Sequence, residues 1–76
     1  MKIRVRAFGP ARDKLGTKDW LEMDLNEGAA IHDLLKMLEA NEDEVMTVLK
    51  KGVRCEDDYV ICENDELQLI PPIFAG

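Results

Sequence analysis

The chain contains no serine, one histidine and two cysteines among its 76 residues. Without a nucleophile placed beside a base, the sequence indicates no hydrolase site. His32 has no partner at metal-ligand spacing, and we expect a surface residue there. The acidic runs 42–44 and 56–58 lack the spacing of a calcium-binding loop. The sequence therefore predicts no metal site.

Cys55 and Cys62 do not form the CxxC pairs of a zinc site, and two thiols do not make a disulfide framework. We expect them to be reduced thiols. No apolar run approaches the ~20 residues that span a membrane. The first residues, MKIRVRAFG, lack the apolar region of a signal peptide. These features predict a cytoplasmic protein with no membrane partner.

Acidic residues outnumber basic ones by 16 to 10, which gives a net charge of −6. This balance argues against nucleic acid as the main partner, because phosphate binding needs a cationic surface. It suits solubility and a partner with a basic surface. Hydrophobic residues make up 46% and charged residues 34%, as in folded proteins. The length predicts a single domain, residues 1–76.

Alternating apolar and polar residues predict strands at 2–8, 20–25 and 66–70. Residues 45–50 are also β-prone, and we expect 53–60 to be irregular with a short extended piece. One helical turn is expected before Gly16. Apolar residues with helical spacing predict an amphipathic helix over 29–40: Ile31, Leu34, Leu35 and Leu38.

The order strand, strand, helix, strand, strand favours an α+β domain with two layers. We expect a mixed sheet of four to five strands with one main helix packed on one face. In the compact arrangement, the first and last strands lie side by side and parallel at the centre. This is the ubiquitin-like β-grasp, a topology that the pattern suggests without proving.

The outer face of this sheet is a candidate contact surface. If the side of the first strand that carries Val5 meets the helix, alternation directs a second set of residues outward. This set is Arg4, Arg6, Phe8, Gln68 and Ile70. Clustered exposed apolar residues indicate a contact surface, and the arginines could pair with a partner's carboxylates. Alternatively, Pro10 or Trp20 covers Phe8, and the arginines belong to an ordinary solvated face.

The chain ends in the apolar sequence LQLIPPIFAG. Two consecutive prolines cannot continue a strand and favour an extended course, so residues 71–76 are predicted to project as a tail. Gly76 has no Cβ, which lets its carbonyl group approach another molecule closely. The tail residues before Gly76 are Pro71, Pro72, Ile73, Phe74 and Ala75. An ordinary domain end is polar and frayed, so this apolar end indicates a functional segment.

Three stretches resemble one family, the small ubiquitin-like sulfur carriers of the MoaD/ThiS type. They are FGPARDKLG (8–16), AAIHDLLKML (29–38) and ENDELQLIPPIFAG (63–76). The Pro-Pro tail is the most specific part, and it is more similar to the small subunit of molybdopterin synthase than to the thiamine-pathway carrier. Two positions depart from the family's pattern. Asn64 stands in place of a turn glycine, and Ala75 in place of the penultimate glycine.

The resemblance implies a chemical cycle centred on the C-terminal carboxylate of Gly76. An adenylating enzyme of the ubiquitin-activating type would use ATP to form an acyl-adenylate, and a sulfur donor would convert this into a thiocarboxylate. The implied partners are that enzyme, the sulfur donor and the larger subunit of molybdopterin synthase. The carrier itself would not be an enzyme and would hold no permanent cofactor.

Two other functions remain open from the sequence. The protein could be a ubiquitin-like modifier that is joined to target lysines through Gly76. It could also be a non-reactive β-grasp interaction module with an inert tail, and Ala75 keeps this alternative open. Carriers of the thiamine, molybdopterin, tungsten-cofactor and tRNA-thiolation pathways all use such a C-terminal tail. The sequence therefore does not identify the pathway.

Overall fold

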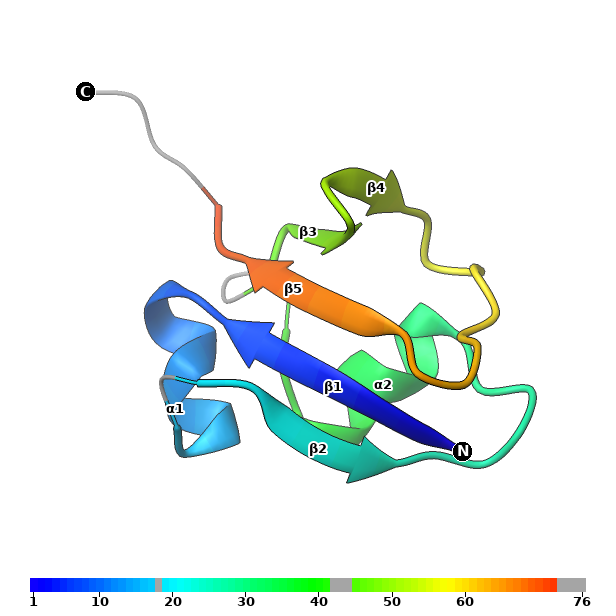
Figure 1. Ribbon diagram of the computed structural model, residues 1–76. Coiled ribbons are helices and arrows are strands. Elements are labelled where there is room, and N and C mark those ends of the chain that lie inside the picture. Colours follow the sequence, from blue (N-terminus) through cyan, green and yellow to red (C-terminus); the bar gives the residue numbers. More distant parts are fainter. Residues whose placement is uncertain (18, 42–44, 73–76) are drawn as a thin grey trace.

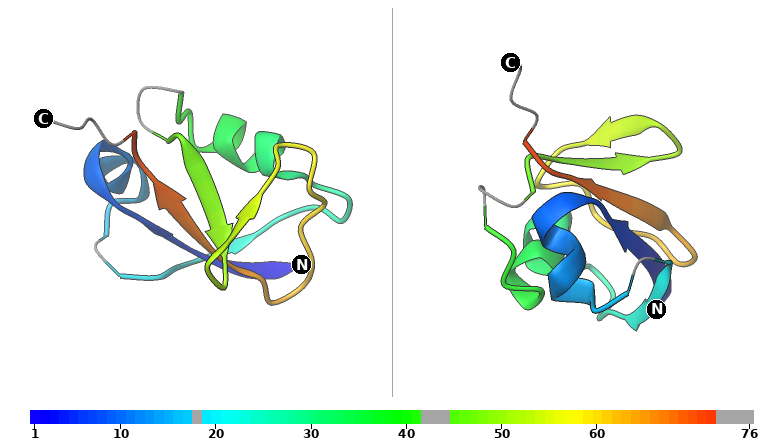
Figure 2. Two further views of the ribbon diagram at one scale, coloured as in Figure 1. Left: turned by 90° about the horizontal axis from the view of Figure 1, so that it is seen from above. Right: turned by 90° about the vertical axis from the view of Figure 1, so that its left-hand side faces the viewer.

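One mixed sheet of five strands forms the frame of the protein, with helices packed on one of its faces (Figures 1 and 2). The computed structural model describes residues 1–17, 19–41 and 45–72. The elements in chain order are β1 (Lys2–Ala7), η1 (Gly9–Ala11), α1 (Arg12–Leu15), β2 (Leu21–Asp24), α2 (Ile31–Met37), β3 (Thr47–Lys50), β4 (Val53–Cys55) and β5 (Glu66–Ile70).

The strand order is β2-β1-β5-β3-β4. The central strands β1 and β5 run parallel, with Ala7 opposite Leu69, and all other neighbours are antiparallel. Because β1 and β5 come from the two ends of the chain, their pairing brings the two halves of the sequence together. The predicted β-grasp is confirmed, with five strands and with α2 as its main helix.

The core lies between the sheet and α2. Val5 of β1, Leu67 and Leu69 of β5, and Ile31 and Leu34 of α2 are each completely buried. Their alternation along the strands places the neighbouring side chains on the opposite face of the sheet. The division into an inner and an outer face predicted from the sequence is therefore confirmed for both central strands.

Helix α2 is shorter than the predicted 29–40. Ala30 is extended and pairs with Val60, while its N–H donates to the Asp33 carboxylate at 2.9 Å, so the helix begins only at Ile31. At the other end, Glu39 has a positive φ of 54°, which is incompatible with a continuing helix. The helix therefore ends two turns after it begins.

The strand boundaries also differ slightly from the expectations. Strand β2 begins at Leu21 and not at Trp20, and β3 begins at Thr47, because Val45 turns into the core. The extended piece expected within 53–60 is β4. The helical turn expected before Gly16 is present as η1 and α1, and Gly16 caps it with a φ of 74°. No helix in the described part of the chain is long and apolar enough to cross a membrane.

Candidate functional site

The end of β5 is held on both sides up to the point where the tail departs. The Phe8 N–H donates to the Leu69 carbonyl at 3.1 Å, and the Met46 N–H donates to the Ile70 carbonyl at 2.8 Å. Pro71 follows without an N–H of its own, so the sheet pairing stops here. The last strand thus leads the chain out of the sheet between β1 and β3.

Gly9 provides the space into which the Pro71 ring fits. Its φ is +66°, and a Cβ added at this position would lie 2.9 Å from Pro71 Cγ. Pro71 and Pro72 are both half-buried. The other predicted tail residues, Ile73, Phe74, Ala75 and Gly76, lie outside the described residues, and their roles stay predictions.

The predicted contact residues on the outer face have different local partners. Arg4 is paired within the chain, with its Nη1 atom 3.0 Å from Glu66 Oε2. The Arg6 guanidinium lies 5.3 Å from the centre of the Phe8 ring, which is half-buried. Arg6 Nε is itself buried and has no hydrogen-bond partner in the described part of the protein. Gln68 and Ile70 are half-buried beside them.

Strands β3 and β4 add two residues to this face that the sequence analysis missed. The register places Arg6 opposite Gln68, Gln68 opposite Leu49, and Leu49 opposite Arg54. These four residues form one row across four strands on the outer face. The turn Lys51-Gly52 between two short β-prone runs was the available signal for this hairpin.

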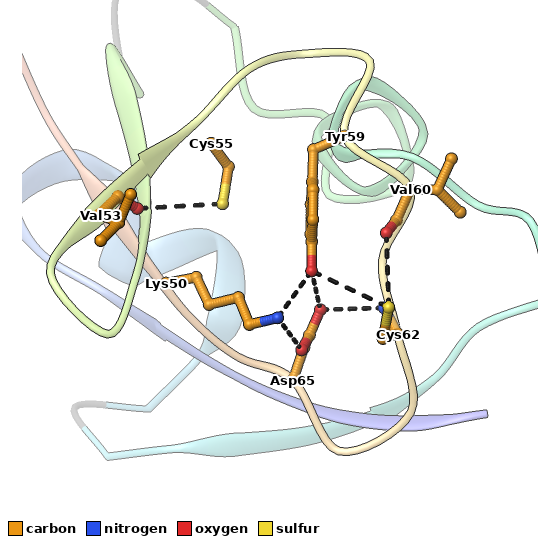
Figure 3. Close-up of polar contacts among 7 residues, drawn as sticks. All are labelled: Lys50, Val53, Cys55, Tyr59, Val60, Cys62 and Asp65. Atoms are coloured by element: carbon orange, nitrogen blue, oxygen red, sulfur yellow. Dashed lines mark hydrogen bonds and ion pairs between the residues drawn. The ribbon is translucent and has the colours of Figure 1, made fainter.

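A polar cluster lies at the opposite end of β5 from the tail (Figure 3). Lys50 Nζ lies 2.9 Å from Asp65 Oδ1 and donates to the Tyr59 hydroxyl at 2.8 Å. The Tyr59 hydroxyl donates to Asp65 Oδ2 at 2.9 Å, and the Cys62 N–H donates to the same oxygen at 2.9 Å. The cluster therefore ties β3, the loop after β4 and the start of β5 together.

The charges in this cluster stabilise one another. Burial alone would raise the pKa of the Asp65 carboxyl, but the hydrogen bonds from Cys62, Lys50 and Tyr59 outweigh it and lower that pKa. The hydrogen bonds to Tyr59 and Asp65 raise the pKa of the Lys50 ammonium group. Both groups are consequently charged at neutral pH, and we assign the cluster a structural role.

Among the residues that the structure describes, neither thiol belongs to a group that could hold a metal. Both cysteines are free, and burial raises the pKa of the Cys55 thiol, which makes it a poorer nucleophile. The Cys62 side chain contacts the Tyr59 hydroxyl, at 4.0 Å. Within residues 1–17, 19–41 and 45–72, no three His, Cys, Asp or Glu side chains converge as metal ligands would.

Comparisons with known proteins find relatives along the length of the chain. The pattern of the ThiS family matches residues 5–76. The molybdopterin synthase sulfur carrier subunit of Chlamydomonas reinhardtii is 29% identical over 84 residues, covering 100% of both chains.

Two solved structures share the fold. A putative molybdopterin converting factor subunit 1 from Pyrococcus furiosus has a TM-score of 0.76 and 22% identity, with 96% of this chain and 99% of that chain covered. The small archaeal modifier protein 1 of Haloferax volcanii has a TM-score of 0.75 and 22% identity, with 95% and 98% covered. At these identities the two structures support the fold alone.

Proposed function

Since this chain belongs to the ThiS family, we propose that it is a sulfur carrier with Gly76 as its working residue. We propose further that it is the small subunit of a molybdopterin synthase. The relative from Chlamydomonas reinhardtii carries that name and aligns over the full length of both chains. The protein would act as a substrate and subunit of enzymes and would have no catalytic side chain of its own.

The proposed cycle has two chemical steps, adenylation and sulfur transfer. The Gly76 carboxylate attacks the α-phosphorus of ATP, which forms an acyl-adenylate and releases pyrophosphate. A hydrosulfide ion then attacks the acyl carbon, and AMP leaves with loss of one proton, so a thiocarboxylate remains. If the donor is a persulfide, a thiol reductant must also cleave the intermediate acyl disulfide. Adenylation is needed because a carboxylate is a poor electrophile until it carries a good leaving group.

The main structural support for this proposal is the geometry at the end of β5, where the tail begins. Hydrogen bonds hold Leu69 and Ile70 on both sides, and Gly9 receives the Pro71 ring. The tail therefore starts from a fixed point, beyond which Pro71 and Pro72 prevent further pairing. A fixed starting point lowers the entropy lost when a tail enters a partner's active site.

The proposed partners follow from the same cycle. They are an adenylating enzyme that uses ATP, a sulfur donor, and the larger subunit of molybdopterin synthase. We propose that the enzyme and the larger subunit contact the outer face around Phe8 and Ile70 while the tail occupies their active sites. ATP would be bound by the activating enzyme, and the protein would work in the cytoplasm.

ATP–pyrophosphate exchange tests the first step. The adenylating enzyme of the same organism should exchange labelled pyrophosphate into ATP only when this carrier is present. A carrier that lacks Gly76 should give no exchange, because the reactive carboxylate would then belong to Ala75 and lie one residue short. Equal exchange with and without Gly76 would contradict the proposal.

A second candidate function uses the same activation but ends in a protein conjugate. The small archaeal modifier protein 1 of Haloferax volcanii, whose name describes a modifier, has the same fold as this chain. A ladder of covalent products that survives reducing conditions and depends on Gly76 would support this function. A non-reactive interaction module would instead keep its function after Gly76 is removed.

A further inference from the structure

The charge of the outer face near the tail differs from the charge of the whole protein. The chain carries a net charge of −6, yet the cross-strand row Arg6, Gln68, Leu49 and Arg54 contains two cations and no carboxylate. Gln68, in the middle of the row, lies on β5 three residues before Pro71, where the tail begins. A partner that receives the tail must therefore meet a locally basic surface.

The two arginines in the row differ from Arg4 in one decisive respect. Arg4 is neutralised by Glu66 at 3.0 Å. In the described part of the chain, by contrast, no carboxylate pairs with Arg6 or Arg54. The Arg6 guanidinium lies 5.3 Å from the centre of the Phe8 ring, and its Nε atom is buried with no hydrogen-bond partner among the described residues. A buried N–H group without an acceptor costs free energy, and a carboxylate of a bound partner would supply the acceptor.

Leu49 separates the two charges and completes an apolar centre. It is half-buried, as are Ile70 on the neighbouring strand β5 and Phe8, which follows β1 on the far side of β5. Interfaces typically have an apolar centre with charged groups at its edge, and arginine is enriched there because its planar group pairs bidentately with carboxylates. The row thus has the composition of a docking surface and extends it from β1 and β5 onto β3 and β4.

We propose that Arg6 and Arg54 are specificity-determining residues for docking. Together they recognise a protein partner that presents carboxylates on both sides of an apolar patch. Arg54 was not among the contact residues predicted from the sequence, and the predicted contact role of Arg4 stays a prediction. This inference rests on the proposed function, because the partner in question is the enzyme that activates Gly76.

The test measures the KM for this carrier in ATP–pyrophosphate exchange by that enzyme. Arg54→Glu should raise the KM about tenfold, and Arg54→Gln about threefold, with kcat unchanged because the tail chemistry is intact. Arg6→Glu should act in the same direction, whereas Arg54→Lys, which keeps the charge but cannot pair bidentately, should raise the KM less than Arg54→Gln does. The difference between wild type and Arg54→Glu should shrink at high salt, since the Debye length is only about 3 Å at 1 M.

Lys36→Glu is the matched control, because it makes the same charge change on an exposed position of α2, across the sheet from the row. It should leave the KM within about twofold of wild type. Melting curves of each variant check the fold. If Arg54→Glu keeps the wild-type KM, or if Lys36→Glu raises it equally, the inference is wrong while the proposed function stands. If the wild-type carrier supports no exchange at all, the proposed function itself fails.

Discussion

Gly9 and Pro71 lie so close together that a Cβ on Gly9 would stand 2.9 Å from Pro71 Cγ. Gly9 has a φ of +66°, and Gly16 has a similar φ of +74° but no atom within 4 Å of its added Cβ. The two glycines therefore share a positive φ and differ in the contact with Pro71. This pair separates a general backbone effect from an effect on the start of the tail.

We predict that Gly9→Ala and Gly16→Ala each lose about 1–2 kcal/mol of unfolding free energy, because a left-handed conformation is unfavourable with a Cβ. Gly9→Ala should lose about 1 kcal/mol more, since its methyl group displaces the Pro71 ring. It should also lower the rate of adenylation, which Gly16→Ala should not. Urea unfolding and pyrophosphate exchange measure the two effects. Equal behaviour of the two variants would show that the Gly9–Pro71 contact is unimportant.

The buried Asp65 carboxylate gives a second prediction. Asp65→Ala removes the acceptor for Cys62 N–H, Tyr59 and Lys50, and it should cost about 2–4 kcal/mol of unfolding free energy. Glu66→Ala, at an exposed neighbouring position, should cost less than about 1 kcal/mol. Because Asp65 lies at the far end of β5, the surviving folded fraction should be adenylated normally. A loss of adenylation without a loss of stability would contradict the structural role.

The stabilising effect of Asp65 should depend on pH. Its pKa is lowered in the folded state, so its contribution is present above the unfolded pKa of about 3.9 and is lost as pH falls through the folded pKa. The pKa of Lys50 is raised, so that contribution is present below about pH 10.4 and declines as pH rises further. The stability difference between wild type and Asp65→Ala should therefore be flat near neutrality and smaller at both extremes. Unfolding measurements from acid to alkaline pH test this prediction. A stability difference that grows toward either extreme would contradict it.

Phe8 should matter more for docking than for stability. It is half-buried, and its ring contacts the Arg6 guanidinium at 5.3 Å. A central aromatic residue of an interface typically contributes about 2 kcal/mol or more to binding, so Phe8→Ala should raise the KM of adenylation about thirtyfold. Val53→Ala, at an exposed position away from the tail, should leave that KM unchanged. A large loss of stability with an unchanged KM would identify Phe8 as a core residue.

Ala75 stands where the family resemblance expects glycine, and the substitution can be reversed. Ala75→Gly should increase kcat/KM for adenylation severalfold, because glycine passes a narrow channel with less steric hindrance. Ala75→Val, which adds bulk, should decrease it strongly. Exchange kinetics with the three carriers at equal concentration measure the order. Equal rates for all three would show that the activating site is wide at this position.

The central fold could be predicted because β1 and β5 alternate cleanly. Val5 and Leu67 face the core, and Arg6 and Gln68 face outward, as period-two patterning requires. The β-grasp pairing then followed from the positions of the strands in the chain. The end of sheet pairing at Pro71 was also predictable, because a proline has no N–H to donate. The tail predicted for residues 71–76 stays a prediction, since 73–76 lie outside the described residues.

The hairpin β3–β4 could not be placed in the same way. Lys50 pairs in register with the buried Leu67, so a charged residue points to the inner side of the sheet. Asp65, fifteen residues later, and the Tyr59 hydroxyl make this position favourable. A pattern that assigns charged residues to the outside therefore misreads β3. Arg54 was overlooked because residues 53–60 were expected to be irregular, whereas Val53–Cys55 form β4.

The most direct test of the sulfur-carrier function is the intact mass of the protein after incubation with its adenylating enzyme, ATP and a sulfur source. Replacement of one carboxylate oxygen by sulfur should add about 16 Da to the wild-type chain and nothing to a chain that lacks Gly76. An unchanged wild-type mass, under conditions in which the enzyme forms the acyl-adenylate, would contradict the function proposed for this protein.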